Sequence, residues 1–324
     1  MMDTLLRIRG LRTEFRSREG VAAAVAGLDL DLASRETLGL VGESGCGKSV
    51  TALSIMRLIA WPPGRIVGGQ ILFKGVDLLS LNEEAMRKIR GQDISMIFQE
   101  PMTSLNPVFR VGEQIGEVFR VHRDMNKADA EVAAVGMLRK VGIPAPEKRV
   151  RDYPHQMSGG MRQRVMIAMA LACNPQLMLA DEPTTALDVT IQAQIAELMN
   201  DIKEQSGTGI VLITHDLGLV AEMADRVAVM YTGMIVEEAS AKQLFGNPLH
   251  PYTMGLLKSI PRIDRGNHGD GKRLHVIAGM VPDLRRLPKG CPFQDRCPEV
   301  IDICKEPPVL EEKTEDHSVR CWRR

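Results

Sequence analysis

One loop constrains this chain more than any other feature. Residues 42–49 read Gly-Glu-Ser-Gly-Cys-Gly-Lys-Ser, which is the spacing G-x-x-x-x-G-K-S. An apolar run of strand length precedes the loop, and apolar residues at helical spacing follow it over residues 49–58. Glycines let successive backbone N–H groups point inward, and the following helix adds the positive end of its dipole. The loop therefore predicts a site for the phosphates of a nucleotide.

Two side chains of the loop have predicted roles of their own. Lys48 is expected against the β- and γ-phosphates, and the Ser49 hydroxyl is expected on Mg²⁺. The alternative is a glycine-rich turn that only links a strand to a helix, and the full spacing with Lys-Ser disfavours it. The predicted nucleotide-binding residues are Gly42, Ser44, Gly45, Gly47, Lys48 and Ser49.

Composition excludes several classes of protein. The 324 residues carry 41 basic and 41 acidic side chains, so no basic excess supports nucleic acid as a partner. No apolar run approaches the roughly 18 to 20 residues that a membrane helix needs. The amino terminus lacks the plan of a signal peptide. We therefore expect a globular, cytoplasmic chain.

The order of the predicted elements indicates an α/β fold. Apolar runs alternate with helical patterns, which favours a phosphate-binding-loop core with a largely parallel sheet. Residues 5–32 read as early strands of a small antiparallel subdomain, and residues 102–156 as a helical insertion. Strands are predicted at residues 37–41, 70–73, 94–98, 177–181, 210–214 and 226–231, and helices at 49–58, 82–90, 158–173, 189–205 and 218–224.

A shift in composition at residues 247–252 predicts a domain boundary. Residues 1–246 would form the nucleotide-binding domain, with the insertion at about 102–156. Residues 247–324 would form a Cys-rich extension. This extension is too poor in apolar residues to fold on a core of its own.

An acidic pair is the predicted second half of the nucleotide site. Asp181 and Glu182 close an apolar strand of the kind that suits a buried parallel position. A carboxylate there can hold Mg²⁺, and the next one can orient or deprotonate an attacking water. We assign Asp181 to the metal and Glu182 to the water. The alternative is a pair of strand-end acids that face solvent.

With these features in place, residues 1–246 resemble the ATP-binding cassette (ABC) family. The segment 158–163, Ser-Gly-Gly-Met-Arg-Gln, is similar to the family's signature segment, with Met157 where leucine is usual and Met161 where glutamine is usual. The family's aromatic residue that stacks on adenine has no counterpart near residues 18–20. The remaining matches are Gln99 to the Q-loop, Ala186-Leu187-Asp188 to the D-loop and His215 to the switch histidine.

The resemblance implies shared sites between two paired cassettes. Ser158, Gly159 and Gly160 would meet the ATP of a second ABC subunit, identical or homologous. Gln99 would contact Mg²⁺ or the water and relay the nucleotide state to the insertion, and His215 would donate to the γ-phosphate and position Glu182. Read alone, these residues are an ordinary helix start, a polar strand end and a structural histidine.

Two further stretches resemble the peptide-importer branch of the family. Residues 247–253, Asn-Pro-Leu-His-Pro-Tyr-Thr, and residues 100–107 are similar to those of dipeptide and oligopeptide permeases. The first stretch is also compatible with a turn that starts a helix. The resemblance implies a di- or oligopeptide as cargo, with nickel, opines, glutathione and sugars as alternatives.

Four of the six cysteines fall in the last 34 residues, with the spacing C-x5-C-x6-C-x16-C. Thiolates that converge in a segment with little core suggest a metal staple. Structural zinc usually uses closer pairs, so we favour a [4Fe–4S] cluster over zinc, and unligated thiols are the third possibility. Cys46 and Cys173 are expected to be small packing residues. The predicted ligands are Cys291, Cys297, Cys304 and Cys321.

The combined expectation is the ATPase subunit of an importer. It would lie at the cytoplasmic face of the inner membrane and work with a second cassette, two transmembrane permeases and, indirectly, a solute-binding protein. Two rival hypotheses are a soluble ABC ATPase of DNA repair or translation and a non-catalytic regulatory module.

Overall fold

A computed structural model describes residues 4–99, 104–185, 187–260 and 276–324. The chain divides into two compact units. The first unit contains residues 1–6, 31–37 and 72–213, and the second contains residues 7–30, 38–71 and 214–324. The predicted features at residues 100–103 and at Ala186 lie outside the described residues.

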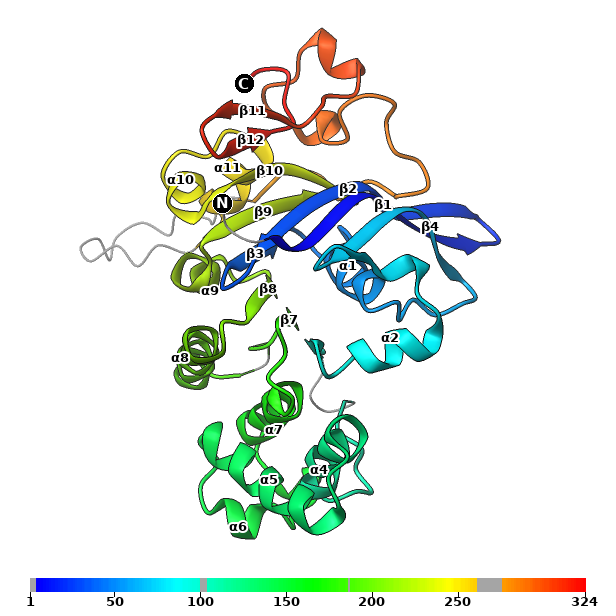
Figure 1. The fold of residues 1–324 in the computed structure, drawn as a ribbon. Coiled ribbons are helices and arrows are strands. Elements are labelled where there is room, and N and C mark those ends of the chain that lie inside the picture. Colours follow the sequence, from blue (N-terminus) through cyan, green and yellow to red (C-terminus); the bar gives the residue numbers. More distant parts are fainter. Residues whose placement is uncertain (1–3, 100–103, 186, 261–275) are drawn as a thin grey trace, which may run out of the picture. The chain divides into compact units, whose positions relative to one another are not determined.

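The first unit contains three parallel strands. Strand β6 (Ile94–Ile97) pairs with β7 (Leu177–Asp181), and β7 pairs with β8 (Gly209–Ile213). Every residue of β7 and β8 is buried. Strands covered on both faces read as continuous apolar runs, and this is the signal that predicted them. The parallel core expected from the alternating pattern is confirmed (Figure 1).

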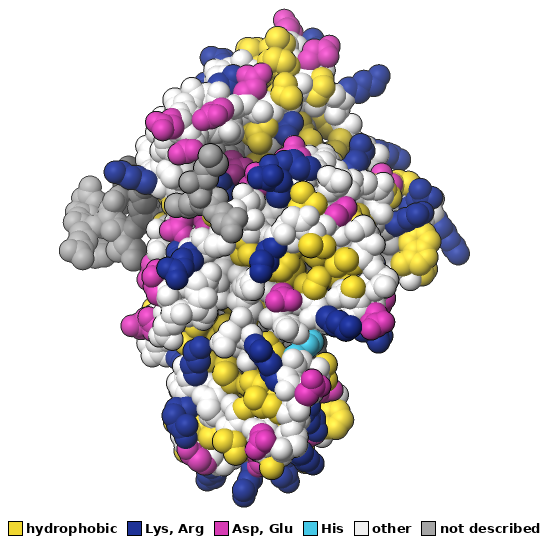
Figure 2. Space-filling model, in the orientation of Figure 1, with side chains coloured by type: hydrophobic (Ala, Val, Ile, Leu, Met, Phe, Trp, Pro, Cys, Tyr) yellow, Lys and Arg dark blue, Asp and Glu magenta, His cyan; other side chains and the backbone are white. Residues whose placement is uncertain are grey.

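The helical insertion follows β6 in the same unit. Helices α4 (Val111–Arg123) and α5 (Lys127–Lys140) pack on each other and on α7 (Gly159–Leu171). A short helix α6 (Pro146–Arg149) and a 3-10 turn η2 (Pro154–Gln156) lead into α7 (Figure 1). Lys and Arg side chains crowd the outer end of this insertion (Figure 2). Helix α8 (Val189–Ser206) connects β7 to β8.

The second unit contains the strand that carries the phosphate loop. Strand β3 (Thr37–Val41) pairs in parallel with β9 (Arg226–Tyr231) through Leu38–Val41, and helix α1 (Lys48–Ile55) begins directly after the loop. Strand β10 (Met234–Ser240) pairs antiparallel with β9. The predicted strand–loop–helix unit is therefore confirmed. Helix α9 (Leu217–Met223) precedes β9.

A smaller sheet has the strand order β2-β1-β4-β5. Its strands are β1 (Thr4–Ser17), β2 (Gly20–Ala33), β4 (Gly64–Phe73) and β5 (Val76–Asp77). The prediction that β4 starts at Gln70 is wrong, because the strand runs through Gly68-Gly69. Gly69 has φ +94°, and a Cβ there would lie 2.6 Å from backbone atoms of Gly10 and Leu11. This glycine allows a close approach of two strands and does not end one.

Helix α2 (Glu83–Ile89) lies within the predicted range 82–90 and is slightly shorter. The Asn82 side chain accepts a hydrogen bond from the backbone N–H of Ala85 and so caps the start of the helix. Arg90 is already extended, with φ −62° and ψ 129°, which ends it. A 3-10 turn η1 (Leu78–Ser80) precedes α2.

The C-terminal extension is part of the second unit and follows helix α10 (Ala241–Gly246). Its elements are α11 (Pro251–Lys258), η3 (Gln294–Arg296), η4 (Asp302–Lys305), β11 (Glu311–Thr314) and β12 (His317–Val319). Strand β12 pairs antiparallel with β10 and with β11. Tyr252 and Phe293 join a buried cluster with Val229 and Tyr231 of β9. The extension therefore shares a buried cluster with β9.

A buried carboxylate holds the extension in place. Glu237 of β10 is fully buried and accepts hydrogen bonds from the backbone N–H groups of Leu249 and His250, at 2.6 and 2.9 Å. The Nε2 atom of His317 on β12 lies 2.7 Å from the same carboxylate. Burial lowers the pKa of His250 to about 3, so its ring stays neutral. Among the helices of the described segments, none combines the length and apolar character needed to cross a membrane.

Candidate nucleotide and cysteine sites

The backbone of the phosphate loop requires glycine at two of its positions. Gly42 has φ +153°, and a Cβ there would lie 2.2 Å from the carbonyl oxygen of Met230. Gly47 has φ +109°, and a Cβ there would lie 2.1 Å from the carbonyl oxygen of Ala24. No side chain fits at such distances. The packing of the second unit is therefore one reason for these glycines. The need for backbone N–H groups that point inward is another.

Lys48 lies within the loop that it is predicted to serve. Its ammonium group donates to the carbonyl oxygens of Gly42 and Glu43, at 2.7 and 3.0 Å, and the residue is 7% exposed. Ser44 and Gly45 are exposed at the tip of the loop. A fixed cation beneath an exposed glycine-rich tip is an arrangement that suits a phosphate chain.

Cys46 and Cys173 are buried, with 0% and 2% exposure, which agrees with their predicted packing role. Burial raises the pKa of both thiols. Neither is poised to react as a thiolate.

The acidic pair lies at the end of β7. Asp181 is 4% exposed, and Glu182 follows it with φ +48°, a conformation that is uncommon for a residue with a side chain. The backbone N–H of Glu182 donates to the carbonyl of Ile213 at 2.8 Å and so ties the residue after β7 to the end of β8. Strained backbone of this kind clusters at functional sites. The observation supports a special role for Glu182.

The structure brings Gln99 and Glu182 together across the sheet. The Gln99 side-chain N–H₂ group donates to Glu182 Oε2 at 3.2 Å, and the Thr185 hydroxyl donates to the same oxygen at 2.7 Å. Thr185 was not predicted as a site residue, and its place three residues after Glu182 was the only available signal. Two donors thus orient one carboxylate oxygen of the predicted base.

The other predicted site residues lie at element boundaries. His215 is exposed and follows β8, and the next residue, Asp216, caps helix α9 by accepting from the N–H groups of Gly218 and Leu219. His215 and the phosphate loop belong to the second unit, whereas Gln99, Asp181 and Glu182 belong to the first.

The signature segment forms a capped helix start. Ser158 Oγ accepts from the backbone N–H of Met161 at 3.3 Å, and Ser158 and Gly159 are exposed. A Cβ on Gly160 would lie 3.0 Å from the Ile191 side chain of α8. Asp188 caps α8 by accepting from the backbone N–H of Ile191 at 2.9 Å. Ser158 therefore acts as an ordinary N-cap of α7. The N-terminus of this helix is exposed and can also bind an anion.

Two of the four tail cysteines, Cys291 and Cys297, have raised thiol pKa values. The Cys291 pKa is raised to about 11, chiefly by burial and further by the nearby thiols of Cys304, Cys297 and Cys321. The backbone N–H of Cys291 also donates to the carbonyl of Cys304, at 2.8 Å. All six cysteines of the chain are free thiols. In the described part of the chain, no group of three or more His, Cys, Asp or Glu side chains is arranged to hold a single metal ion.

Two residues of the extension reach the phosphate loop and were not predicted to do so. The Tyr252 hydroxyl accepts from the backbone N–H of Glu43 at 2.8 Å. The Arg296 guanidinium donates to both oxygens of the Glu43 carboxylate, at 2.7 and 2.9 Å. Tyr252 lies in a stretch that the sequence had singled out, but Arg296 carried no signal beyond its position next to Cys297.

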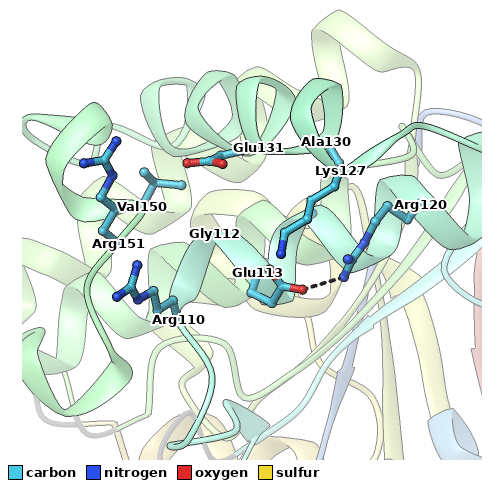
Figure 3. Close-up of a pocket in the computed structure, with 10 residues that line it drawn as sticks. Arg110, Gly112, Glu113, Arg120, Lys127, Ala130, Glu131, Val150 and Arg151 are labelled. Carbon is cyan, nitrogen blue, oxygen red and sulfur yellow. Dashed lines mark hydrogen bonds and ion pairs between the residues drawn. The ribbon is translucent and has the colours of Figure 1, made fainter.

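A hollow of about 220 Å³ lies in the helical insertion, between α4, α5 and α6 (Figure 3). Four cationic side chains border it, from Arg110, Arg120, Lys127 and Arg151. Two carboxylates, Glu113 and Glu131, also line it. Arg120 forms an ion pair with Glu113 at 2.9 Å, and Lys127 points toward the same carboxylate (Figure 3). The lining is polar, with an excess of positive charge.

Two family models match the chain. Residues 25–185 match the ABC transporter model, and residues 236–304 match the model described as the oligopeptide/dipeptide transporter C-terminal region. The second match covers Glu237, Tyr252, Arg296 and three of the four tail cysteines.

Curated relatives match over nearly the whole chain. The probable peptide ABC transporter ATP-binding protein y4tR of Sinorhizobium fredii is 54% identical over 99% of this chain and 95% of its own length. The oligopeptide transport ATP-binding protein OppD of Escherichia coli is 51% identical, over 99% and 94%. The dipeptide transport ATP-binding protein DppD of Bacillus subtilis is 50% identical, over 99% and 95%.

Solved structures of cassettes share the fold. A dimeric ATP-binding cassette in a post-hydrolysis state, bound to ADP and Pi, has a TM-score of 0.66 and 26% identity. The match covers 73% of this chain and 98% of that one. A cassette of Clostridium perfringens from the cbiONQ transporter complex has a TM-score of 0.64 and 24% identity, over 76% of this chain and 92% of that one.

Proposed function

This chain belongs to the ABC transporter family, and we propose that it is the ATP-hydrolysing subunit of an importer for di- or oligopeptides. Peptides are supported as the cargo by the C-terminal family match at residues 236–304. Sequence identity of about 50% to peptide-transport relatives along the whole chain also supports them. Its ATPase character follows from the family. The cassette would span residues 1–246 and the extension residues 247–324.

Phosphate binding, Mg²⁺ binding and activation of water would be carried out by different residues. The loop from Gly42 to Ser49 would bind the phosphates, with Lys48 against the β- and γ-phosphates. Hydroxyl, carboxylate and amide oxygens are the ligands that Mg²⁺ prefers, and Ser49, Asp181 and Gln99 supply them. When bound, the ion neutralises phosphate charge. Glu182, held by Gln99 and Thr185, would accept a proton from the water that attacks the γ-phosphorus.

A second cassette would complete each site. The exposed N-terminus of α7 at Ser158, Gly159 and Gly160 offers backbone N–H groups to an anion that the chain's own loop does not need. His215 is exposed, as a residue that meets a γ-phosphate at such an interface would be. The dimeric, ADP-bound state of a structural relative supports this arrangement. Asp188, at the start of α8, would face the partner.

The remaining partners would be two transmembrane permeases, with the chain bound at the cytoplasmic side of the membrane. Closure of two cassettes around ATP would move the helical insertions and so switch the permeases between inward- and outward-facing states. The positive hollow between α4, α5 and α6 lies on this moving part.

The location is testable by fractionation. We expect the chain, expressed with its neighbouring permeases, to sediment with the membrane fraction and to co-purify with them in detergent. A rival soluble ABC ATPase would instead remain with ribosomes or DNA. That distribution, with no permease bound, would contradict the importer and leave the ATPase intact.

We further propose that Cys291, Cys297, Cys304 and Cys321 hold a [4Fe–4S] cluster. Four cysteine thiolates are the usual ligands of such a cluster, and the other three thiols lie near enough to Cys291 to help raise its pKa. The backbone N–H of Glu299 also donates to the Cys297 sulfur at 3.4 Å. When bound, the cluster would fasten two 3-10 turns and the last residues of the extension together. Zinc is the alternative occupant.

Metal content after anaerobic purification tests this assignment. The wild-type chain is expected to contain iron and sulfide, and Cys291→Ser to lose both, because one ligand of the cluster is missing. Cys173→Ala, which removes a buried thiol outside the group, should keep them. Zinc in place of iron would establish the alternative. Unchanged iron in Cys291→Ser would remove Cys291 from the ligand set.

A further inference from the structure

We propose that Arg296 and Tyr252 are positioning residues for ATP binding, because together they fix Glu43 within the phosphate loop. The proposal rests on the role of the loop in ATP binding and is independent of the cargo. It gives the extension a direct part in the nucleotide site, in addition to any metal that it holds.

Tyr252 fixes the backbone of Glu43. Its hydroxyl accepts from the Glu43 N–H at 2.8 Å, and the whole residue is 0% exposed. Its ring packs against Tyr231 and Phe293, with centroids 4.7 and 5.4 Å away. The hydroxyl therefore has little freedom. The hydrogen bond to this fixed acceptor keeps the loop ordered, so that little entropy is lost when ATP binds.

Arg296 fixes the side chain of the same residue. Its two bonds to the Glu43 carboxylate form a fork, and its side chain is 4% exposed. The Nε atom donates to the carbonyl of Ala278 at 3.0 Å, and Nη1 lies 3.4 Å from the Tyr231 hydroxyl. The guanidinium carbon lies 5.8 Å from the Tyr231 and Phe293 ring centroids. A bidentate pair of this kind sets both direction and distance.

The position of Glu43 matters for the phosphates in two ways. Its carbonyl oxygen accepts from the Lys48 ammonium at 3.0 Å, so a displaced Glu43 would also displace the cation. In addition, an unpaired carboxylate in a phosphate cradle would repel ATP, and Arg296 neutralises it. The next residues of the loop, Ser44 and Gly45, are exposed.

The three groups come from distant parts of the sequence. Tyr252 lies 209 residues after Glu43, and Arg296 lies 253 residues after it. Both belong to the extension, whose Tyr252 and Phe293 lie in a buried cluster with residues of β9. A segment whose only role was to cover the sheet would not need the buried Arg296 side chain to bind Glu43 of the phosphate loop.

Equilibrium binding of Mg²⁺-ATP to the full-length chain tests the proposal. Arg296→Lys keeps the charge but loses the fork, and we expect the Kd to rise about tenfold. Tyr252→Phe keeps the packed ring and loses only the acceptor, and we expect a rise of about three- to tenfold. The matched control is Arg324→Lys. Arg324 donates from Nη2 to both carboxylate oxygens of Glu299, at 2.9 and 2.7 Å, so the control is also an ion pair within the extension.

The melting temperature of each nucleotide-free variant shows whether it still folds. A positioning role predicts that the Kd for ATP rises for Arg296→Lys and Tyr252→Phe and stays within about twofold of wild type for Arg324→Lys. Wild-type ATP affinity in both Arg296→Lys and Tyr252→Phe would overturn the proposal, even if their melting temperatures were lower. An equal loss of affinity in Arg324→Lys would also overturn it. A wild-type chain that bound no ATP would instead refute the nucleotide site itself.

Discussion

Glu182→Gln is expected to lower the turnover of ATP by about 10²- to 10⁴-fold, which is the range for loss of a general base. Glutamine keeps the shape of the side chain, so the contacts from Gln99 and Thr185 to the remaining oxygen can persist. The amide cannot accept a proton from the attacking water. Phosphate release and ATP binding should be measured on the same preparation, and ATP affinity should change little.

A carboxylate of the same unit provides the control for this variant. Glu197 is exposed on α8, and Glu197→Gln should hydrolyse ATP at the wild-type rate. Undiminished hydrolysis by Glu182→Gln would refute the assignment of Glu182 as the base.

Lys48→Ala is expected to weaken ATP binding about 100-fold, because charged hydrogen bonds to two phosphates are lost. The residue is buried in the loop, and its ammonium group already lies against the Gly42 and Glu43 carbonyls. Titration with Mg²⁺-ATP gives the Kd, and the melting temperature reports whether the loop still folds.

Lys88→Ala is the matched control, since Lys88 is a surface lysine whose side chain is 75% exposed. It should bind ATP as wild type does. An ATP affinity of Lys48→Ala within a few-fold of wild type would contradict the role of the loop lysine.

The sequence predicted the elements whose signals are local. Strands β7 and β8 are buried apolar runs apart from Asp181 at the end of β7 and Gly209 at the start of β8, and the loop before α1 has an unmistakable spacing. The contact between Gln99 and Glu182 was not predicted, because no local pattern places the end of β6 beside the end of β7. Parallel pairing of the two strands produces it.

Other features depend on contacts that no local pattern encodes. Strand β11 is exposed at every residue and has no apolar alternation, so its pairing with β12 could not be foreseen. Gly68-Gly69 had the composition of a strand end but allows close approach to Gly10. The contacts of Arg296 with Glu43 join residues 253 positions apart, and they become visible only once the extension is packed on β9.

Peptide uptake by reconstituted vesicles tests the central claim most directly. Vesicles that contain the chain, its permeases and the solute-binding protein should accumulate a labelled di- or tripeptide when ATP is supplied on the side that carries the chain. The same vesicles with Glu182→Gln should accumulate none above the ATP-free background. Equal uptake with the wild-type chain and with Glu182→Gln, or no peptide uptake by a wild-type assembly that hydrolyses ATP, would contradict the account.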